Sequence, residues 1–386
     1  MSHKILVLTV VEFNTNPRVR RQLQALSLEH QIVTAGIGES EFNFPHINLE
    51  VRHRLMVGRI NLLAIPRVLA LGLLMLTGQH KIAELFFSMS WTSLPNWRVS
   101  KKLKRESFSF VCAHDVQSVG LAKQLVSPEN IWMDLPEIAA FQNENSPKWQ
   151  ALWGRHFAYQ TRISRVCCSH FTTVSSALQI IFYHEFGIQP ELLPNTSPRR
   201  DDLESSISST GQIRLVHTGA AISSRGLELM IYAVSELPHL FNLDMYLTQI
   251  SPKYLEELRR IASETTNVRV LSPVPQNLLV DTINQYDASI IFVNPINTNQ
   301  RFCLPNKLFD SIQARVPVIS GPTPDIARII NEHQIGWVTD GFAVSDIVQT
   351  LQKISRESIQ QLLPNMEAAA EEFMERDSTF AKKLLG

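Results

Sequence analysis

The stretch IRLVHTGAAISSRGLELMIYAV, residues 213–234, decides the fold of this chain. A mostly apolar run ends at Gly219, a polar loop follows through Gly226, and the apolar spacing of a helix comes next. A strand that passes through a glycine loop into a helix is the repeating unit of a doubly wound parallel sheet. Gly219 lets a ligand approach the backbone, and Arg225 adds a permanent positive charge suited to a diphosphate. An exposed loop arginine is the alternative.

Apolar runs of the same continuous character recur along the whole chain. Continuous rather than alternating apolar residues are typical of strands covered on both faces. One series lies at 5–10, 31–37, 108–114, 130–136 and 171–175, and a second at 213–219, 243–249, 268–273, 288–294 and 316–322. Helical patterns separate the strands of the second series, near 226–237, 253–265, 306–314 and 324–333. This order predicts an α/β protein with two Rossmann-like, doubly wound domains.

The polar stretch 194–212, rich in Ser, Pro and charge, separates the two series and is the best linker in the chain. We therefore predict an N-terminal domain of residues 1–197 and a C-terminal domain of residues 198–365. In such an arrangement the two domains face a central cleft, where a ligand is expected to bind.

Composition excludes several classes of protein. The 386 residues include 36 Lys and Arg against 36 Asp and Glu, and a zero net charge argues against nucleic acid as the main partner. The cysteines show no Cys-x-x-Cys or Cys/His spacing, so neither disulfides nor a metal site is expected; they are Cys112, Cys167, Cys168 and Cys303. Because the N-terminus has the pattern of a first strand and not of a signal peptide, we expect a reduced, cytoplasmic protein.

Absent motifs narrow the chemistry further. The sequence contains no G-x-G-x-x-G after the first strand, no G-x-x-x-x-G-K-[ST], no H-E-x-x-H and no G-x-S-x-G. These absences argue against a dinucleotide dehydrogenase, a P-loop ATPase, a zinc protease of the zincin class and an ordinary esterase.

The run INLLAIPRVLALGLLML, residues 60–76, is the candidate for membrane contact. Pro66 and Arg67 interrupt it, and it falls short of the ~20 apolar residues that a spanning helix needs. Two interpretations stay open. It is a helix of a soluble domain, or an interfacial helix that meets lipid head groups together with Arg54, Arg59 and Arg67, which would place the protein at the inner face of the membrane.

The segment LPNKLFDSI, residues 304–312, is a second candidate for phosphate binding. Pro305 precedes a helix that begins at Asn306, and its free N–H groups with the Lys307 charge suit a phosphate. Asp310 lies one turn further on, where a carboxylate can accept two ribose hydroxyls. The alternative is a surface ion pair between Lys307 and Asp310.

In the first domain, Asn16 and Pro17 predict the start of a helix at the end of the first strand. Arg18 would then meet either a phosphate or acidic acceptor in the cleft, or solvent on an ordinary helix face.

Polar residues also follow the next two strands of that domain. His114 and Asp115 end the strand 108–114, and Glu137 follows the strand 130–136. A histidine at a strand's carboxyl end can bind a sugar hydroxyl or exchange a proton, since imidazole titrates near neutrality.

With these residues identified, the chain resembles the GT-B glycosyltransferases, and most closely the retaining enzymes of family 4. The resemblance covers nearly the whole chain, and the order and spacing of its segments carry it. The segments are NPRVRRQLQAL (16–26), AHD (113–115), MDLPE (133–137), TTVSSALQIIFYHEFGI (172–188), LLPN (192–195), HTGAAISSRGLELMIYAVSELP (217–238) and LPNKLFDSIQARVPVISG (304–321).

The resemblance implies a C-terminal domain that binds a nucleotide sugar, an acceptor-side N-terminal domain, and a last helix, at about 366–386, that packs back on the N-terminal domain. Arg225 and Lys307 would neutralise the donor diphosphate, beside Gly219 and Asn306, and Asp310 would bind the ribose. His114 would lie near the transferred sugar. The acceptor side would hold Asn16, Arg18, Asp115 and Glu137. No metal or other cofactor is expected, because GT-B enzymes generally lack a metal-binding D-x-D site.

Two positions depart from the family pattern. Phe302 stands where the first acid of the E-x7-E pattern is expected, and Ala220 where a basic residue often follows the glycine. The implied function is transfer of a sugar from a UDP- or GDP-sugar to a glycan or lipid-linked acceptor in cell-surface polysaccharide biosynthesis, with retention. Two alternatives stay open: a non-catalytic GT-B partner subunit, and a GT-B sugar-nucleotide epimerase.

Overall fold

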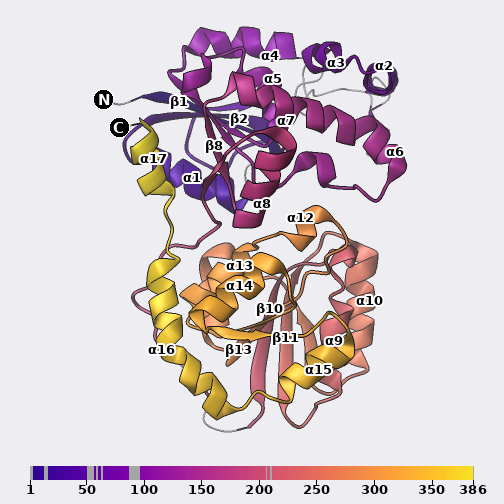
Figure 1. The fold of residues 1–386 in the computed structure, drawn as a ribbon, viewed down its shortest axis with the longest axis vertical. Coiled ribbons are helices and arrows are strands. Elements are labelled where there is room, and N and C mark those ends of the chain that lie inside the picture. The colour runs from indigo at the N-terminus through magenta and orange to yellow at the C-terminus, as the bar shows by residue number, and fades with distance from the viewer. Residues whose placement is uncertain are drawn as a thin grey trace. The chain divides into compact units, whose positions relative to one another are not determined.

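In the computed structural model the chain divides into two α/β units (Figure 1). The structure describes residues 3–12, 16–49, 56–57, 60–61, 64–86, 96–205, 207–208 and 211–385. Unit 1 comprises residues 1–193 and 376–386, and unit 2 comprises residues 194–375. The first boundary thus falls slightly earlier than the predicted 197/198. The return to unit 1 comes later than the predicted 366, because residues 366–375 still belong to unit 2.

The sheet of unit 1 has seven parallel strands in the order β3-β2-β1-β6-β7-β8-β9. From β1 the chain first adds strands on one side, β2 and β3, and then on the other side, starting with β6. Open α/β sheets bind ligands at the carboxyl ends of the strands at such a switch point. The strands are β1 (Lys4–Glu12), β2 (Gln31–Ile37), β3 (His46–Asn48), β6 (Phe110–His114), β7 (Ile131–Asp134), β8 (His170–Thr173) and β9 (Glu191–Leu192), with a separate antiparallel pair of β4 (Met56–Val57) and β5 (Ile60–Asn61).

Helices cover both faces of this sheet. Side chains of α1 and α17 share one core with β1 and with Trp132 of β7, and Figure 1 shows α5 and α7 on the other side. The helices are α1 (Pro17–Ser27), α2 (Ala64–Leu76), α3 (His80–Phe86), α4 (Asn96–Leu103), α5 (Val119–Ala122), α6 (Pro147–Trp149), α7 (Arg155–Cys167), α8 (Ser176–Ile181) and α17 (Asp377–Leu385). The last of these carries the chain's predicted return to the first domain.

The sheet of unit 2 has six parallel strands in the order β12-β11-β10-β13-β14-β15. This is the strand order of a dinucleotide-binding Rossmann fold, with its switch point between β10 and β13. The strands are β10 (Ile213–Ala220), β11 (Phe241–Thr248), β12 (Val268–Leu271), β13 (Ala288–Ile291), β14 (Val318–Ser320) and β15 (Gly336–Val338). The helices are α9 (Glu228–Ser235), α10 (Pro252–Ser263), α11 (Leu279–Asn284), α12 (Thr298–Arg301), α13 (Asn306–Gln313), α14 (Pro324–His333), α15 (Val344–Leu351) and α16 (Arg356–Glu372).

The apolar runs of β10 are buried on both faces, as their continuous pattern predicts. Leu215 packs with α9, α10 and α15, whereas its neighbour Val216 packs on the opposite side with Ile283 of α11 and Ala314. The predicted fold class, two Rossmann-like α/β domains, is confirmed.

The run 60–76 contains the helix α2, of 13 residues. Among the described residues, none of the helices is both long and apolar enough to cross a membrane. Three leucines of α2 are largely exposed: Leu69 by 68%, Leu73 by 64% and Leu76 by 59%. Their spacing of four and three residues places them along one side of the helix. Arg54 and Arg59 lie outside the described residues, and so does the side chain of Arg67.

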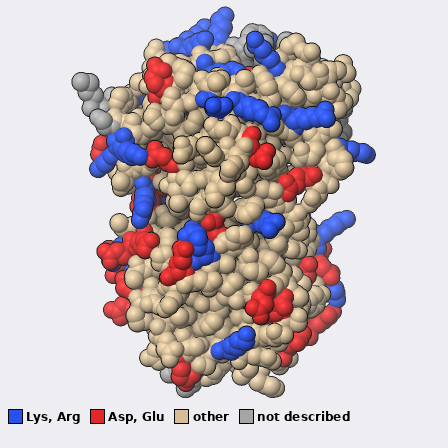
Figure 2. Space-filling view, viewed as in Figure 1, with Lys and Arg blue, Asp and Glu red and all other residues tan. Residues whose placement is uncertain are grey.

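The zero net charge of the chain conceals an uneven distribution. Unit 1 contains 22 Lys and Arg against 15 Asp and Glu, a net charge of +7, and unit 2 contains 14 against 21, a net charge of −7. On the face shown in Figure 2, Lys and Arg predominate over unit 1 and Asp and Glu over unit 2. Unit 1 is therefore the part of the molecule that attracts anions over a distance.

Candidate functional site

The end of β10 and the loop after it are held in conformations that favour glycine. Gly219 has φ +144° and Gly226 has φ +65°, and the single turn η8 (Ser223–Arg225) lies between them. The Gln300 side-chain amide of α12 donates to Ser224 Oγ at 2.9 Å, which fastens this turn to a neighbouring segment. The loop thus presents Arg225 from a fixed backbone at the switch point of the sheet.

The helix α13 brings Lys307 to the same place. A Cβ atom added to Gly219 would lie 2.8 Å from Lys307 Nζ and 3.8 Å from an Nη atom of Arg225. A side chain at position 219 would therefore displace the ammonium group, and glycine is required here for close approach as well as for its φ. The predicted grouping of Gly219, Arg225 and Lys307 is present in the structure.

His217 holds Lys307 in this position. Its Nδ1 lies 2.8 Å from the Ile290 carbonyl oxygen, an acceptor, so Nδ1 carries the proton and Nε2 is free to accept. Lys307 Nζ lies 3.3 Å from that Nε2. Both side chains are buried, with His217 0% and Lys307 8% exposed. Sequence reasoning passed over His217 because it occupies an ordinary strand position.

Burial makes this cluster electrostatically costly. Burial first, and then repulsion by Arg225, lower the pKa of the Lys307 ammonium to about 7. Burial also lowers the pKa of Arg225, and burial with the Lys307 charge holds the pKa of His217 well below its usual range. Cys303 offers no compensating negative charge, because burial raises its pKa to about 11. An arriving anion would relieve this repulsion.

Lys307 and Arg225 have no carboxylate within ion-pair distance in the parts of the chain that the structure describes. Asp310 lies one turn after Lys307, but its Oδ1 accepts a hydrogen bond from Ser197 Oγ at 2.5 Å. It is 4% exposed, so the alternative of a surface ion pair with Lys307 is wrong. Asn306, half-buried, is the first residue of α13, whose N-cap Pro305 makes no side-chain capping bond.

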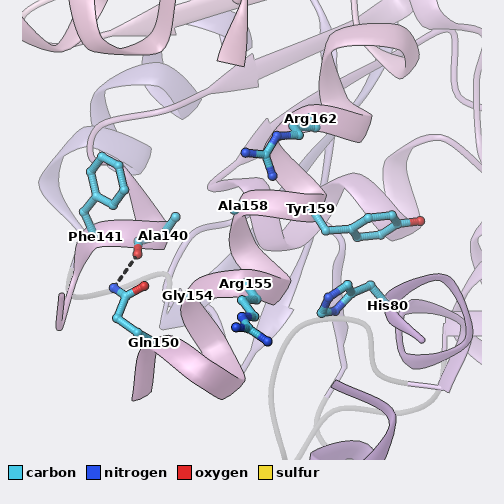
Figure 3. A pocket seen from close by; sticks show the side chains of 9 residues that line it. All are labelled: His80, Ala140, Phe141, Gln150, Gly154, Arg155, Ala158, Tyr159 and Arg162. Carbon is cyan, nitrogen blue, oxygen red and sulfur yellow. Dashed lines mark hydrogen bonds between the residues drawn. The ribbon is translucent and has the colours of Figure 1, made fainter. Parts of the chain in front are cut away.

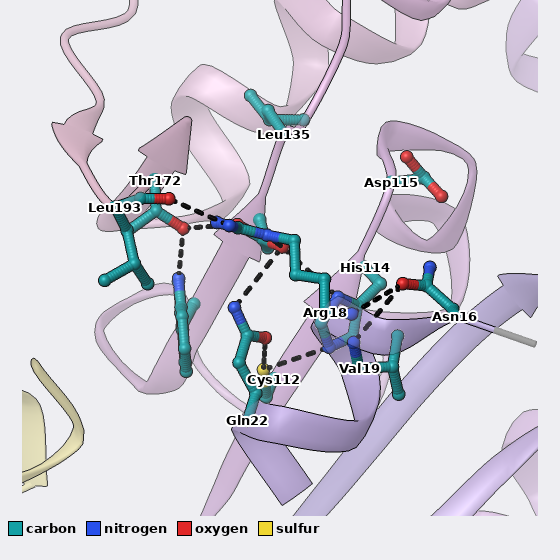
Figure 4. A network of polar contacts seen from close by, with 12 residues as sticks. Asn16, Arg18, Val19, Gln22, Cys112, His114, Asp115, Leu135, Thr172 and Leu193 are labelled. Atoms are coloured by element: carbon teal, nitrogen blue, oxygen red, sulfur yellow. Dashed lines mark hydrogen bonds and ion pairs between the residues drawn. The ribbon is translucent and has the colours of Figure 1, made fainter. Parts of the chain in front are cut away.

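Two of the predicted residues of unit 1, Arg18 and His114, lie in a buried polar network, and Asn16 lies beside it (Figure 4). Asn16 caps α1 as expected: its Oδ1 accepts from the backbone N–H groups of Arg18 at 3.0 Å and Val19 at 3.4 Å. Arg18 Nε and an Nη atom donate to the two carboxylate oxygens of Asp134 at 2.5 and 2.6 Å, and the other Nη donates to the Leu193 carbonyl at 2.8 Å.

This network corrects the role of Arg18. The side chain is 4% exposed and its guanidinium binds Asp134, so it does not lie on a solvent-exposed helix face. Burial alone would raise the pKa of Asp134, but the charge and hydrogen bonds of Arg18, with His114, hold that pKa well below its usual range. Arg18 and Asp134 form a buried ion pair that ties α1 to β7.

His114 belongs to the same network. It is 2% exposed, its Nδ1 lies 3.3 Å from Asp134 Oδ2, and its Nε2 lies 3.7 Å from Cys112 Sγ. Both ring nitrogens of His114 therefore face protein groups. The sequence predicts this histidine near the transferred sugar, where it could bind a hydroxyl or exchange a proton.

Asp115 and Glu137 lie where the sequence predicted, after β6 and β7, and keep partial exposure. Asp115 has φ 62° and ψ 146°, a region occupied almost only by glycine. Burial by the surrounding protein, with repulsion by Glu137, raises the pKa of Asp115 to about 8. Burial also raises the pKa of Glu137, against a hydrogen bond from Gln142. This carboxyl pair can hold a proton near neutral pH.

The chain thus combines two Rossmann-like units, and one of them carries a cation cluster at its switch point. No protein-family model matches the sequence, and no curated protein matches it.

Solved structures match almost the whole chain. WaaG, a glycosyltransferase involved in lipopolysaccharide biosynthesis, superposes with a TM-score of 0.65 at 14% identity, over 99% of this chain and 100% of its own. Sucrose-phosphate synthase from Thermosynechococcus elongatus gives 0.71 at 10% identity, over 99% and 97%. Anabaena Alr3699/HepE, in complex with UDP and glucose, gives 0.68 at 10% identity, over 99% of both chains. At such identities the likeness shows the fold alone, and that fold is GT-B.

Proposed function

We propose that this protein is a glycosyltransferase that moves a sugar from a UDP- or GDP-sugar to a glycan or lipid-linked acceptor in cell-surface polysaccharide biosynthesis. The observation that carries the proposal is a pair of cations at the backbone of Gly219, the buried Lys307 and the partly buried Arg225, without a described carboxylate partner. Buried charge without a partner destabilises a protein, so its presence at a switch point favours an anionic ligand.

The cations act on the departing nucleotide. When the bond between the sugar and the diphosphate breaks, negative charge develops on the diphosphate oxygens. Lys307, held by His217, and Arg225 stabilise that charge more strongly than the ground state, which lowers the barrier. Asp310 is assigned to the ribose, beside Asn306 at the entrance of α13.

We propose that no metal ion takes part, since the protein supplies its own cations for the diphosphate. Transfer is then expected to proceed at an unchanged rate after EDTA treatment and dialysis. A loss of activity that Mg²⁺ or Mn²⁺ restores would contradict this assignment.

Unit 1 is assigned to the acceptor. Its net charge of +7 and the exposed leucines of α2 suit an anionic, lipid-linked glycan and peripheral contact with a membrane surface. The four cysteines are free thiols, in keeping with the proposed cytoplasmic location. Asp115 and Glu137 are assigned to the acceptor hydroxyl, and Arg18, Asn16 and His114 to supporting the strand ends that carry them.

Retention of configuration is part of the proposal, by resemblance to family 4. The anomeric configuration of the product, read by proton NMR, tests it. An inverted product would overturn retention and would instead make Asp115 the general base, because its pKa of about 8 suits it to accept a proton near neutral pH.

The donor is tested by thermal shift with UDP, GDP, ADP, CMP and their sugar conjugates, since a ligand of the folded state raises the unfolding temperature. The expected result is one clear winner among the uridine or guanosine compounds. Anabaena HepE, which shares the fold, is described with UDP and glucose, and this favours UDP.

The non-catalytic alternative rests on Phe302 and Ala220. If no nucleotide at millimolar concentration changes the unfolding temperature of the wild type, or of the Lys307→Gln and Arg225→Gln variants, that alternative is favoured.

A further inference from the structure

A concave site lies within unit 1, apart from the cation cluster of unit 2 (Figure 3). It is a pocket of about 440 Å³ between α3, the turns η5 (Ala139–Phe141) and η6 (Gln150–Gly154), and α7. This volume is within the range of pockets that hold small ligands. The turn η6 is π-helical, a local distortion that occurs frequently at functional sites.

Gly154 makes room at the base of the pocket. An added Cβ there would lie 2.3 Å from Gln150 Oε1, so the Gln150 side chain folds across the glycine. The amide nitrogen of Gln150 donates to the Ala140 carbonyl at 3.0 Å, which fixes the side chain in that position. The pocket wall is therefore built by specific contacts.

Two arginines of α7 line the pocket. Arg155 and Arg162 are seven residues apart, two helical turns, and so lie on one face of the helix. Within the described ranges neither has a carboxylate at ion-pair distance, and Arg162 instead lies over the Phe186 ring, 5.7 Å from its centroid. Both guanidinium groups are available to a ligand.

The opposite wall adds polar groups without negative charge. His80 stacks on Tyr159 with ring centroids 5.4 Å apart, and its buried Nδ1 has no hydrogen-bond partner in the described structure. Burial, and then the Arg155 charge, lower the pKa of His80, which favours the neutral ring. A buried ring nitrogen without a partner favours a polar ligand.

We infer that this pocket binds a phosphate group of the acceptor. Arginine pairs are suited to phosphate because each guanidinium can donate two parallel hydrogen bonds to its oxygens. The positive net charge of unit 1 would attract such a ligand, and the pocket has room for an attached sugar. The identification with the acceptor rests on the proposed function, whereas phosphate binding itself does not.

The phosphate could stand on a soluble sugar or on a lipid, and titration calorimetry distinguishes these. The full chain, saturated with UDP to occupy unit 2, is titrated with glucose 6-phosphate and with farnesyl phosphate in detergent micelles. Glucose and farnesol serve as the matched compounds without phosphate. Binding of either phosphorylated probe, but of neither parent alcohol, is the expected result, and the tighter probe identifies the source.

The variant Arg155→Gln/Arg162→Gln is expected to weaken binding of the phosphorylated probe at least tenfold. Arg165→Gln, on the same helix but outside the pocket, is expected to change it less than twofold. UDP binding by the double variant should stay unchanged, which shows that the protein is folded.

Equal binding of phosphate and parent compounds, unchanged binding by the double variant, or no binding of either probe by the wild type would overturn the inference. Failure of UDP to bind the wild type would instead count against the proposed function, and the probes would then be titrated without it.

Discussion

Buried charge serves opposite ends in the two units. In unit 1, Arg18 meets both oxygens of Asp134, and the pair connects α1 to β7 inside the domain. In unit 2, Lys307 and Arg225 lie beside each other at Gly219. The carboxylate one turn further along α13, Asp310, accepts a hydrogen bond from Ser197. A cation paired with a carboxylate of its own protein stabilises the fold, whereas two neighbouring cations without a carboxylate partner are the proposed site for an anionic ligand.

The largest effect should come from breaking the satisfied pair. Arg18→Ala leaves Asp134 as an uncompensated buried charge, which typically costs about 3–5 kcal/mol. Urea unfolding of unit 1 is expected to show this loss, while UDP binding in unit 2 persists below the transition. Arg105→Ala, an exposed change in unit 1, is the control and should stay within about 0.5 kcal/mol of the wild type. A loss below about 1 kcal/mol in Arg18→Ala would contradict the structural role.

Removing the cation without a carboxylate partner, Lys307, should weaken ligand binding and leave stability intact. Lys307→Gln is expected to weaken UDP binding by about 10- to 100-fold, the value of a lost charge-assisted hydrogen bond. Stability should not fall, because the pKa of Lys307 is lowered to about 7 in the folded protein. The charged form is thus penalised at pH 6, and that penalty disappears only as pH rises from about 7 toward the unfolded value.

Calorimetry and thermal unfolding at pH 6 test both halves of this prediction, with Lys353→Gln as the exposed control in unit 2. A variant that binds UDP normally, or that is markedly less stable, would show that Lys307 is a structural residue like Arg18.

The two kinds of cation should also differ in their response to pH. Under the proposed function the diphosphate binds the protonated Lys307, and affinity for UDP is then expected to fall by up to about tenfold per pH unit above 7. Measurements between pH 7.5 and 9 avoid the titration of the nucleotide's own phosphate, whose pKa is near 6 in a phosphate ester. The dependence should vanish in Lys307→Gln and remain in His114→Gln; a slope shared by both variants would assign the proton elsewhere.

The smallest expected effect concerns strain at Asp115. Asp115→Gly is expected to stabilise unit 1 by about 1 kcal/mol, since a non-glycine residue in this conformation costs about 1–3 kcal/mol and glycine loses part of that through its flexibility. The rate of sugar transfer to the acceptor should fall in the same variant, and an activity assay measures this separately.

Asp115→Asn, which keeps the strain, distinguishes charge from backbone. The folded pKa of about 8 lies above the usual carboxyl value, so the wild type loses stability as pH rises from about 4 to 8, whereas the asparagine variant does not. Equal stability of wild type and Asp115→Asn at pH 4 and at pH 8 would refute this account.

Much of unit 2 could be predicted from sequence because its signals are local. A glycine after an apolar run and a Pro-Asn-Lys entrance to a helix place Gly219, Arg225 and Lys307 at one edge of a parallel sheet, whatever the details of packing. His217 was missed because its partners, Ile290 and Lys307, lie far along the chain.

The errors in unit 1 have the same cause. Arg18 and Asp134 are 116 positions apart, and nothing in the residue types tells that one will neutralise the other. The strands β3, β9 and β15, of two or three residues each, are too short to show an apolar pattern and were not predicted. A strand could therefore be predicted only where its apolar run was long enough, and a side-chain pair only where its two residues lie close together in the sequence.

The last helix has a consequence for how the protein is made. Phe380 of α17 packs on Trp132, with ring centroids 4.9 Å apart, and closes a core that begins with Ile5. Unit 1 is thus discontinuous, with all of unit 2 inserted before its final piece. During synthesis at ~5–20 residues per second, the ribosome takes ~10–40 s to add residues 194–375. During that time the core of unit 1 lacks α17. Unit 2, although it is translated second, is therefore the first unit that can complete its fold.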